Sequence, residues 1–487
     1  MDLTYLKSLV YGAFSFFLLA ACTTTVPPSL VLPVPEPKQV EWQKMETYAF
    51  VHFGMNTFTD SEWGFGDADP SLFDPSDLDC EQWVQTFVKA GMKGVILTAK
   101  HHDGFCLWPS VFTDYSVKSS PWKDGKGDVV RELSDACKKY GIKFAVYLSP
   151  WDRNRADYGS PAYVEYFYNQ LNELMTQYGK VFEIWVDGAN GGDGWYGGAK
   201  EARQIDRKNY YDLARLYKMA AELQPQAMLF SDGGPDCRWV GNESGYAGET
   251  NWSFLRKGVV YPGYPKYQEL SSGHADGDQW TPAECDVSMR PGWFYHQSED
   301  SLVKTVDQLK DLYYRSVGHN ATLLLNFPVD KTGKVNPTDS ANAVQWHQEI
   351  QKELADDLLA GLNPKASDTR DREFSTKNLT DGNCDTYWAT GDSTFSASLI
   401  FCLPQKVSIN RLVLQEYIPL GQRVKKFVVE VFVGDVWVPV DTREETTTIG
   451  YKRILRFNTV GTDRLRIRFE ESRGPLCISN IEAYCVE

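Results

Sequence analysis

Short apolar runs of the kind that form buried strands alternate with amphipathic helical stretches along much of the chain. The apolar runs are Tyr48–Phe53, Gly94–Ala99, Lys143–Leu148, Val181–Val186, Ala227–Phe230 and Ala321–Leu325. The helical stretches are Cys80–Ala90, Val129–Tyr140, Pro161–Tyr178, Lys208–Leu223 and Ser301–Ser316, with a last one at Asp339–Ala360. This alternation predicts a parallel sheet covered by helices, and therefore a (β/α)8-like barrel over residues 39–360. A doubly wound open sheet is the alternative, but no glycine-rich phosphate loop follows the first strand.

The pattern changes after Asn363-Pro364-Lys365, where helical periodicity stops. Short alternating runs follow at Ser398–Phe401, Ser408–Gln415, Phe427–Val433, Trp437–Val440, Lys452–Phe457 and Leu465–Phe469. Closely spaced short strands are typical of an antiparallel β-sandwich. We expect a second domain of this kind at residues 361–487.

The N-terminus has the pattern of a targeting segment. An apolar stretch, Val10–Ala20, leads into Leu19-Ala20-Ala21-Cys22, which reads as a bacterial lipobox. Residues 1–22 would then be a lipoprotein signal peptide, with Cys22 lipidated, and the proline-rich residues 23–38 a tether to the folded protein. The expected location is the periplasm or the cell surface, with the lipid on Cys22 as the only membrane contact.

Charge and composition narrow the class of ligand. The formal net charge is -15 and no long run of Lys or Arg occurs, so the basic surface that nucleic-acid binding requires is missing from the sequence. Aromatic residues make up 14% of the chain, which fits large cores or sugar-stacking surfaces. A neutral ligand fits this composition better than a charged one.

Polar residues that end apolar strands are the candidates for chemistry, because the active site of a barrel gathers at the carboxyl ends of its strands. Asp187 follows Phe182–Val186 and precedes a glycine. Its ordinary alternative is a capping or turn role. His52, His101, His102 and Tyr147 end three other predicted strands. Several strand ends that carry polar groups together favour a catalytic interpretation.

A metal site is disfavoured by the spacing of the histidines. His101 and His102 are adjacent, so on a strand they would point to opposite faces. Neither a His-x-x-x-His pattern nor a Cys/His cluster is present. We expect no catalytic cofactor, and imidazoles together with Glu62 are suited to hydrogen-bonding the hydroxyls of a sugar.

Several motifs, taken in order, resemble the family 29 α-L-fucosidases. They are His52-Phe53-Gly54, Glu62-Trp63, Lys100–Trp108, Trp185–Gly188 and Leu323–Pro328. The resemblance implies that Asp187 is the nucleophile. It also implies a fucose pocket lined by His52, Glu62, His101, His102, Tyr147 and Trp185, with Trp63 packed beside the sugar.

The run Arg238–Gly245 resembles the branch of that family that acts on α-1,3- and α-1,4-linked fucose. In this reading Glu243 is the acid/base, with Glu249 as the second choice. Arg238 would orient a carboxylate, and Trp293 would stack on the substrate. Retaining glycosidases use two such carboxyl groups, one as nucleophile and one as acid/base. A fucosylated oligosaccharide or glycan is the expected substrate.

In the tail, Asn378–Trp388 resembles a discoidin-like, carbohydrate-binding family 32 module. The resemblance implies a structural calcium held by Asp381, Asn383, Thr386 and Glu482, whose oxygens suit a hard cation. A plain polar turn is the alternative.

Three functions from different classes follow from these observations. The first is a retaining exo-α-L-fucosidase. The second is a catalytically silent surface lipoprotein that binds fucosylated glycans, which the presence of both acids argues against. The third is a metal-dependent hydrolase, which the absence of ligand spacing disfavours.

Overall fold

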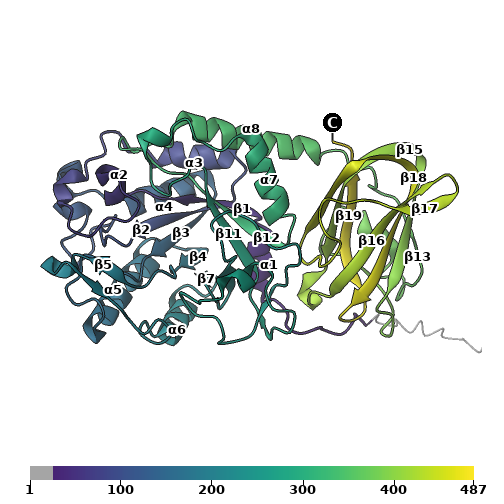
Figure 1. The fold of residues 1–487 in the computed structure, drawn as a ribbon, viewed down its shortest axis with the longest axis horizontal. Helices are drawn as coiled ribbons and strands as arrows, with labels where there is room; N and C mark the ends of the chain where they lie inside the picture. Colours follow the sequence, from purple (N-terminus) through teal and green to yellow (C-terminus); the bar gives the residue numbers. More distant parts are fainter. Residues whose placement is uncertain (1–25, 487) are drawn as a thin grey trace, which may run out of the picture.

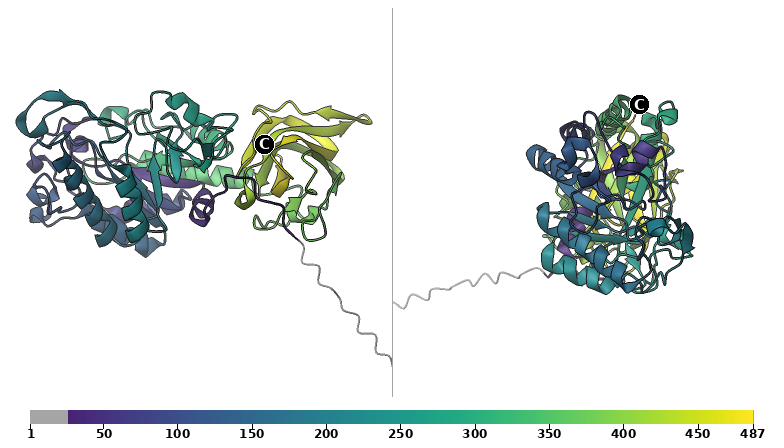
Figure 2. Two further views of the ribbon diagram at one scale, coloured as in Figure 1. Left: turned by 90° about the horizontal axis from the view of Figure 1, so that it is seen from below. Right: turned by 90° about the vertical axis from the view of Figure 1, so that its left-hand side faces the viewer.

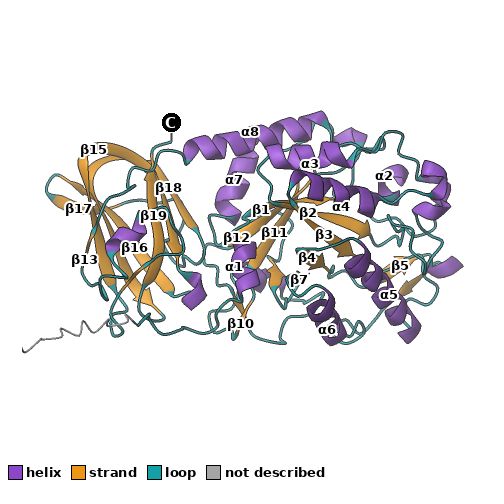
Figure 3. Cartoon of the chain, turned by 180° about the vertical axis from the view of Figure 1, so that it is seen from behind, coloured by secondary structure: helices purple, strands orange, loops and turns teal. Residues whose placement is uncertain are grey.

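The computed structural model describes residues 26–486, and these form two domains side by side (Figures 1 and 2). The first contains a barrel of strands surrounded by helices, and the second is built almost entirely of strands (Figure 3). The helix α8 runs along the barrel toward the second domain. The two predicted fold classes are therefore confirmed.

Eight parallel strands close the barrel in the order β1-β12-β11-β8-β7-β4-β3-β2. Their buried apolar residues form the alternating runs seen in the sequence. The strands are β1 (Thr47–Val51), β2 (Gly94–Lys100), β3 (Lys143–Leu148), β4 (Glu183–Trp185), β7 (Met228–Ser231), β8 (Cys237–Trp239), β11 (Ala283–Ser288) and β12 (Ala321–Asn326).

Two of these strands lie outside the predicted apolar runs. β11 carries Glu284 and Asp286, and β8 carries Arg238, so neither reads as an apolar strand although all their side chains but Trp239 are buried. β7 and β8 are parallel neighbours, with Phe230 opposite Cys237, yet no helix connects them. Because the link between them is short and contains no helix, a pattern of alternating strands and helices does not reveal this part of the barrel.

Helices cover the outside of the barrel because each buries one apolar face against the strands. Most begin at an Asp, Asn, Ser or Thr that precedes the first turn. They are α2 (Met55–Thr59), α3 (Cys80–Lys89), α4 (Val129–Tyr140), α5 (Pro161–Gln177), α6 (Leu213–Leu223), α7 (Val306–Ser316) and α8 (Pro337–Glu353). Two small pairs of strands lie in loops: β5 (Gly192–Gly194) with β6 (Glu201–Arg203), and β9 (Phe254–Leu255) with β10 (Gln279–Trp280).

A polar network fills the interior of the barrel. The short helix α1 (Pro37–Gln43) contributes Trp42, whose indole N–H donates to Glu183 Oε2 at 2.8 Å. Glu284 lies beside Glu183 and accepts from the Trp185 indole at 2.7 Å and from the Tyr48 hydroxyl. Burial and the neighbouring carboxyl raise the pKa of Glu183, and burial raises that of Glu284. The pair therefore holds its protons to higher pH than free glutamates do.

The second domain is an antiparallel sandwich whose longest strands, β15 and β18, pair along most of their length. Its apolar side chains, including Trp388, Phe427 and Ile467, form a core of their own. The strands are β13 (Lys365–Ala366), β14 (Trp388–Ala389), β15 (Ala397–Glu416), β16 (Val424–Val433), β17 (Val436–Pro439), β18 (Arg453–Ser472) and β19 (Cys477–Tyr484).

The proline-rich segment, which the sequence predicts to be a semi-rigid tether, is bound to the sandwich from residue 26 onward. Residues 26–36 lie along the sandwich, where Arg423 donates to the Ser29 carbonyl, Arg473 to that of Leu32 and Arg370 to that of Val26. Proline-rich extended backbone exposes its carbonyl groups, which arginines can bind. The barrel domain then begins with α1 at Pro37 rather than at residue 39. The predicted signal peptide and Cys22 lie outside the described residues.

Within residues 26–486, no helix combines the length and the apolar character needed to cross a bilayer.

Candidate active site

A pocket of about 250 Å³ opens at the carboxyl ends of the barrel strands. Ligand pockets usually range from about 300 to 1,000 Å³, so this one is small. It brings together most of the predicted site residues. The lining consists of Phe50, His52, Trp63, His101, His102, Tyr147, Trp185, Asp187, Gly188, Ala189, Phe230, Asp232, Trp239, Glu243, Gly263, Asp286 and Trp293.

Asp187 is placed at the end of β4, where the strand stops and the chain turns. Its Oδ2 accepts from the Tyr147 hydroxyl at 2.9 Å, and its Oδ1 accepts from the Ala189 N–H at 2.7 Å. Burial raises the pKa of Asp187, while these two hydrogen bonds lower it. The glycine that follows is required because a Cβ at Gly188 would lie 2.4 Å from Asp232 Oδ1.

The three pocket histidines are neutral. Burial lowers the pKa of His52 and of His102 to about 3, and that of His101 falls well below its ordinary value. His52 Nδ1 pairs with Asn326 Oδ1 at 2.8 Å, and His102 Nδ1 with Ser149 Oγ at 2.7 Å. The contact of 3.9 Å between His102 Nε2 and Asp187 Oδ2 is therefore not an ion pair. Neutral imidazoles held in this way can hydrogen-bond sugar hydroxyls.

His101 and His102 both face the pocket, contrary to the alternation predicted for a strand. Their ring centroids are 4.1 Å apart. The reason is that β2 ends at Lys100, so the two residues lie beyond the strand and its alternation does not apply to them. No group of three or more His, Cys, Asp or Glu side chains in residues 26–486 is arranged to hold a metal ion.

Aromatic rings form the floor and one rim of the pocket. Trp185 stacks on Phe230 with centroids 4.0 Å apart and lies against Tyr147 at 5.1 Å. Trp63 stands at the rim with 52% of its surface exposed, in edge contact with His102. Flat apolar surface of this kind packs well against the C–H face of a sugar ring.

Glu243 lies at the exposed side of the same pocket. The Trp293 indole N–H donates to Glu243 Oε2 at 3.2 Å. Partial burial of the carboxyl group and the charges of Asp187 and Glu62 raise the pKa of Glu243, whereas the Trp293 hydrogen bond lowers it. A raised pKa is what a carboxylic acid needs in order to donate a proton near neutral pH.

Glu62 does not line the pocket as predicted. Its two oxygens accept from the backbone N–H groups of Trp293 and Phe294, at 2.8 and 3.1 Å, and from His296 Nε2 at 2.7 Å. Two adjacent backbone donors and one imidazole fix the position of the carboxylate. Glu62 therefore supports the loop that carries Trp293.

Two further predicted residues lie elsewhere. Arg238 is fully buried and donates to the backbone carbonyls of Leu270 and Thr281 and to Asn251 Oδ1, so it orients no carboxylate. Glu249, the second choice for acid/base, makes an ion pair of 2.9 Å with Arg453 of the sandwich. Neither residue is part of the pocket lining.

Two acids of the pocket were not predicted from the sequence. Asp232 follows β7, and burial raises its pKa to about 7; the strand-end rule could have found it. Asp286 accepts from the Trp239 indole at 2.8 Å, and burial with the charge of Glu243 raises its pKa well above the ordinary value. It lies in β11, the strand that the apolar pattern does not reveal.

The predicted calcium ligands of the sandwich are already hydrogen-bonded. Asp381 Oδ1 accepts from the Asn383 N–H and its Oδ2 from the Thr386 hydroxyl. The oxygens of Glu482 accept from Asn480 and Tyr484. Asp381, Asn383 and Thr386 thus form a turn, while Glu482 is directed to its own strand.

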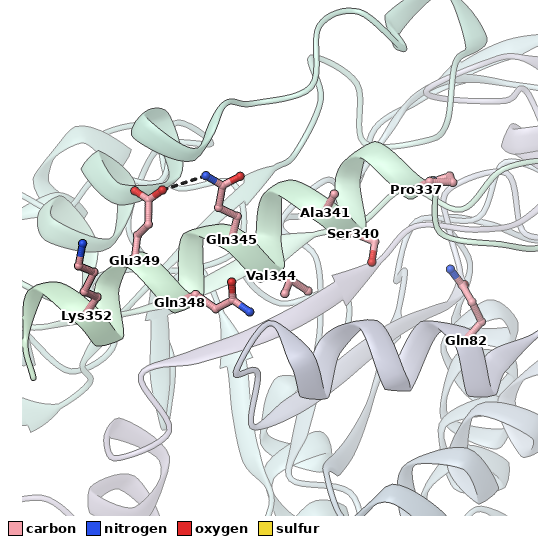
Figure 4. Close-up of a pocket in the computed structure, with 9 residues that line it drawn as sticks. All are labelled: Gln82, Pro337, Ser340, Ala341, Val344, Gln345, Gln348, Glu349 and Lys352. Carbon is pink, nitrogen blue, oxygen red and sulfur yellow. Dashed lines mark hydrogen bonds between the residues drawn. The ribbon is translucent and has the colours of Figure 1, made fainter.

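Another groove lies on the outside of the barrel between α3 and α8 (Figure 4). It is lined by Gln82, Pro337, Ser340, Ala341, Val344, Gln345, Gln348, Glu349 and Lys352. Glu349, its single carboxylate, accepts from Gln345 and contacts Lys310. The groove holds neither paired carboxyls nor aromatic rings, so it does not compete with the pocket at the strand ends.

The pocket thus combines Asp187 and Glu243, two carboxyl groups of different surroundings, with two further acids, neutral hydrogen-bonding imidazoles and aromatic surface, at the catalytic end of a (β/α)8 barrel. This arrangement defines a glycoside hydrolase. Residues 31–346 match the family model "Alpha-L-fucosidase", and residues 378–467 match "NedA-like, galactose-binding domain". The chain belongs to the glycoside hydrolase 29 family of α-L-fucosidases.

Relatives that cover nearly the whole chain agree with this assignment. Alpha-L-fucosidase 1 of Arabidopsis thaliana is 41% identical over 94% of this chain and 88% of its own length. A family 29 member from a rumen bacterium is 45% identical, with a TM-score of 0.85 over 95% of this chain and 78% of its own. A Ruminococcus gnavus family 29 fucosidase in complex with fucose is 33% identical, with a TM-score of 0.84 over 95% of this chain and 97% of its own. The expected enzyme class, an α-L-fucosidase, is confirmed.

Proposed function

We propose that this α-L-fucosidase is a retaining exo-enzyme in which Asp187 is the nucleophile and Glu243 the acid/base. The observation that carries the proposal is the placement of both carboxyl groups on one small pocket, Asp187 half-buried at its wall and Glu243 at its exposed side. A sugar whose anomeric carbon faces Asp187 would direct its leaving oxygen toward Glu243.

In the first step, Asp187 attacks the anomeric carbon while the bond to the aglycone oxygen breaks, and Glu243 gives that oxygen its proton. In the second step, Glu243 takes a proton from a water molecule, whose oxygen displaces Asp187 from the anomeric carbon. Fucose is released, and both carboxyl groups return to their starting states. The neutral histidines would bind the sugar hydroxyls without changing the charge of the site.

The size of the pocket supports cleavage of a terminal residue. A cavity of about 250 Å³ takes one monosaccharide, so the rest of the glycan must lie outside. The relative from Ruminococcus gnavus has been crystallised with fucose, and we propose the same sugar for this pocket. The preference for α-1,3 and α-1,4 linkages rests on the motif Arg238–Gly245.

The test is fucose release from a branched Lewis-type trisaccharide by the wild type and by Asp187→Asn, Glu243→Gln and Glu249→Gln. We expect no release by Asp187→Asn, a strong loss in Glu243→Gln and a smaller, partial loss in Glu249→Gln. Proton NMR recorded early in the reaction should show that the released fucose is the α-anomer. The β-anomer would contradict retention, and a wild type inert on this and on simpler fucosides would favour the binding-protein alternative.

We also propose that the chain is exported as a lipoprotein anchored through Cys22, on the basis of the lipobox-like sequence before it. Labelling with a radioactive fatty acid should modify the wild type and not Cys22→Ala. The same substitution should move the enzyme from the membrane fraction to the soluble fraction.

The calcium of the sandwich stays a prediction. A titration with Ca²⁺ that raises the melting temperature of the wild type and not that of Asp381→Ala would support it. If Ca²⁺ raises the melting temperature of neither protein, residues 381–386 are the polar turn that their hydrogen bonds describe.

A further inference from the structure

The segment from Glu243 to Ser253 connects the pocket to the sandwich domain. It contains no helix or strand, and β9 begins only at Phe254. Backbone hydrogen bonds tie its middle to the barrel, from Ala247 N–H to the Arg315 carbonyl and from Gly248 N–H to that of Ser271, both 2.9 Å. Without regular structure, the position of such a segment depends on the side chains that bind it.

The far end of this segment is bound by the sandwich. Arg453 of β18 donates from Nη2 to Glu249 Oε2 at 2.9 Å and from Nη1 to the Glu249 carbonyl at 2.8 Å. The Glu445 N–H donates to the same Oε2 at 3.0 Å, and the Thr447 hydroxyl to the same carbonyl at 3.0 Å. Arg453 is only 1% exposed. A buried arginine with two fixed acceptors holds its partner far more firmly than a surface ion pair does.

The next residues continue the same interface. The Asn251 N–H donates to Thr448 Oγ1 at 2.9 Å, and the Ser253 N–H to Gln422 Oε1 at 2.8 Å. On the barrel side, Arg238 donates to Asn251 Oδ1 at 2.8 Å. The segment is therefore fixed between two parts of the protein. On one side is Arg238 of β8, which precedes the pocket residue Trp239, and on the other side is the sandwich.

We infer that the sandwich is a working part of the catalytic apparatus, in which Arg453 and Glu249 are positioning residues that keep the Glu243 segment over the pocket. The inference rests on the proposed role of Glu243 as acid/base. It gives the second domain a function that requires no carbohydrate binding. It also explains why an acid near Glu243 in sequence faces away from the pocket.

The experiment compares two substrates that differ in their need for an acid. A fucosylated trisaccharide requires protonation of its leaving oxygen, whereas α-L-fucosyl fluoride loses fluoride without it. General acid catalysis contributes about 10²- to 10⁴-fold, and small displacements of a catalytic group can cost about 10²-fold. We expect Arg453→Met and Glu249→Gln in the full-length enzyme to lower kcat/KM for the trisaccharide about 10- to 100-fold, and that for the fluoride less than about 3-fold.

The matched control is Arg468→Met, which removes another β18 arginine, paired with Glu430 and Glu470 far from the segment. It should leave both activities unchanged. Equal losses on both substrates, together with a lower melting temperature, would reduce Arg453 to a merely structural role and overturn the inference. Unchanged activity of both Arg453→Met and Glu249→Gln would overturn it too. If Arg453→Met fails to fold, Glu249→Gln, with its partly exposed side chain, decides.

Glu243→Gln separates the two levels of the proposal. It should lose kcat/KM on the trisaccharide and keep kcat/KM on the fluoride, which reports only the first step and not the later attack by water. If it does not, the acid/base assignment fails. If it does while Arg453→Met and Glu249→Gln behave like the wild type, only the inference about the sandwich fails.

Discussion

The Tyr147 hydroxyl donates a hydrogen bond of 2.9 Å to Asp187 Oδ2. Tyr147 ends β3 and Asp187 follows β4, so the pairing of these two strands sets the contact. The hydrogen bond stabilises the carboxylate form of an acid whose pKa burial raises. It thereby keeps the proposed nucleophile ionised in a site that favours the neutral form.

Tyr147→Phe should shift the acidic limb of the pH profile of kcat/KM to higher pH. The nucleophile must be deprotonated, so activity falls as the pH drops through the pKa of Asp187. Loss of the hydrogen bond raises that pKa. A hydrogen bond to a charged group contributes about 1.5–3 kcal/mol, so kcat/KM at neutral pH should also fall about 10-fold or more. An unchanged acidic limb would contradict the assignment of that limb to Asp187.

Trp293→Phe should shift the alkaline limb of the pH profile of kcat/KM. As the proposed acid, Glu243 must be protonated, so activity falls as the pH rises through its pKa. The Trp293 indole lowers that pKa, and its removal raises it, which moves the alkaline limb to higher pH. Trp239→Phe is the control, because its indole bonds to Asp286 and not to Glu243. Equal shifts in both variants would show that the effect is not specific to the hydrogen bond with Glu243.

Glu62→Gln should lower kcat/KM by about 10-fold, since an amide oxygen replaces a carboxylate that accepts two backbone N–H groups. The loop with Trp293 would then move, which tryptophan fluorescence can report. Asp60→Asn is the control, because Asp60 contacts the same His296 but not the loop backbone. We expect it to stay within about 2-fold of the wild type. Wild-type activity in Glu62→Gln would show that the loop holds Trp293 without this carboxylate.

The carboxyl pair inside the barrel predicts a dependence of stability on pH. Glu183 and Glu284 have raised pKa values in the folded state, so the folded protein keeps protons that the unfolded chain releases above about pH 4.3. Their stabilising contribution is present at lower pH and is lost as the pH rises through the folded pKa values. The melting temperature of Glu284→Gln should therefore fall less steeply with rising pH, between pH 5 and pH 9, than that of the wild type.

Glu284→Leu tests the same network in another way. It leaves the Trp185 indole N–H buried without an acceptor, at a cost of about 1–3 kcal/mol, whereas the Tyr48 hydroxyl still has Thr322 Oγ1 at 3.0 Å. Chemical denaturation of the three proteins at pH 6 should rank Glu284→Leu as the least stable. A Leu variant as stable as the Gln variant would mean that the Trp185 indole finds another acceptor.

The sequence predicts the barrel well where apolar runs form strands, and the pocket where polar residues end them, as at Asp187 and His52. It fails where a strand carries charge. Glu284 and Asp286 occupy a barrel strand because their side chains are buried among other polar groups, a compensation that only the fold reveals. The roles of Glu62 and Arg238 could not be predicted for a related reason. Both are close in sequence to residues that line the pocket, but the groups that bind their side chains come from segments distant in sequence.

The interior below Trp185 is filled by Trp42, Tyr48 and Leu324, so the pocket has no second opening in this direction. Fucose must leave through the mouth by which the glycan enters. In the proposed exo mechanism the rest of the glycan occupies that mouth, which imposes an order of product release: the shortened glycan departs first and fucose last. Fucose should consequently compete with the substrate for the free enzyme, and its accumulation would slow the reaction.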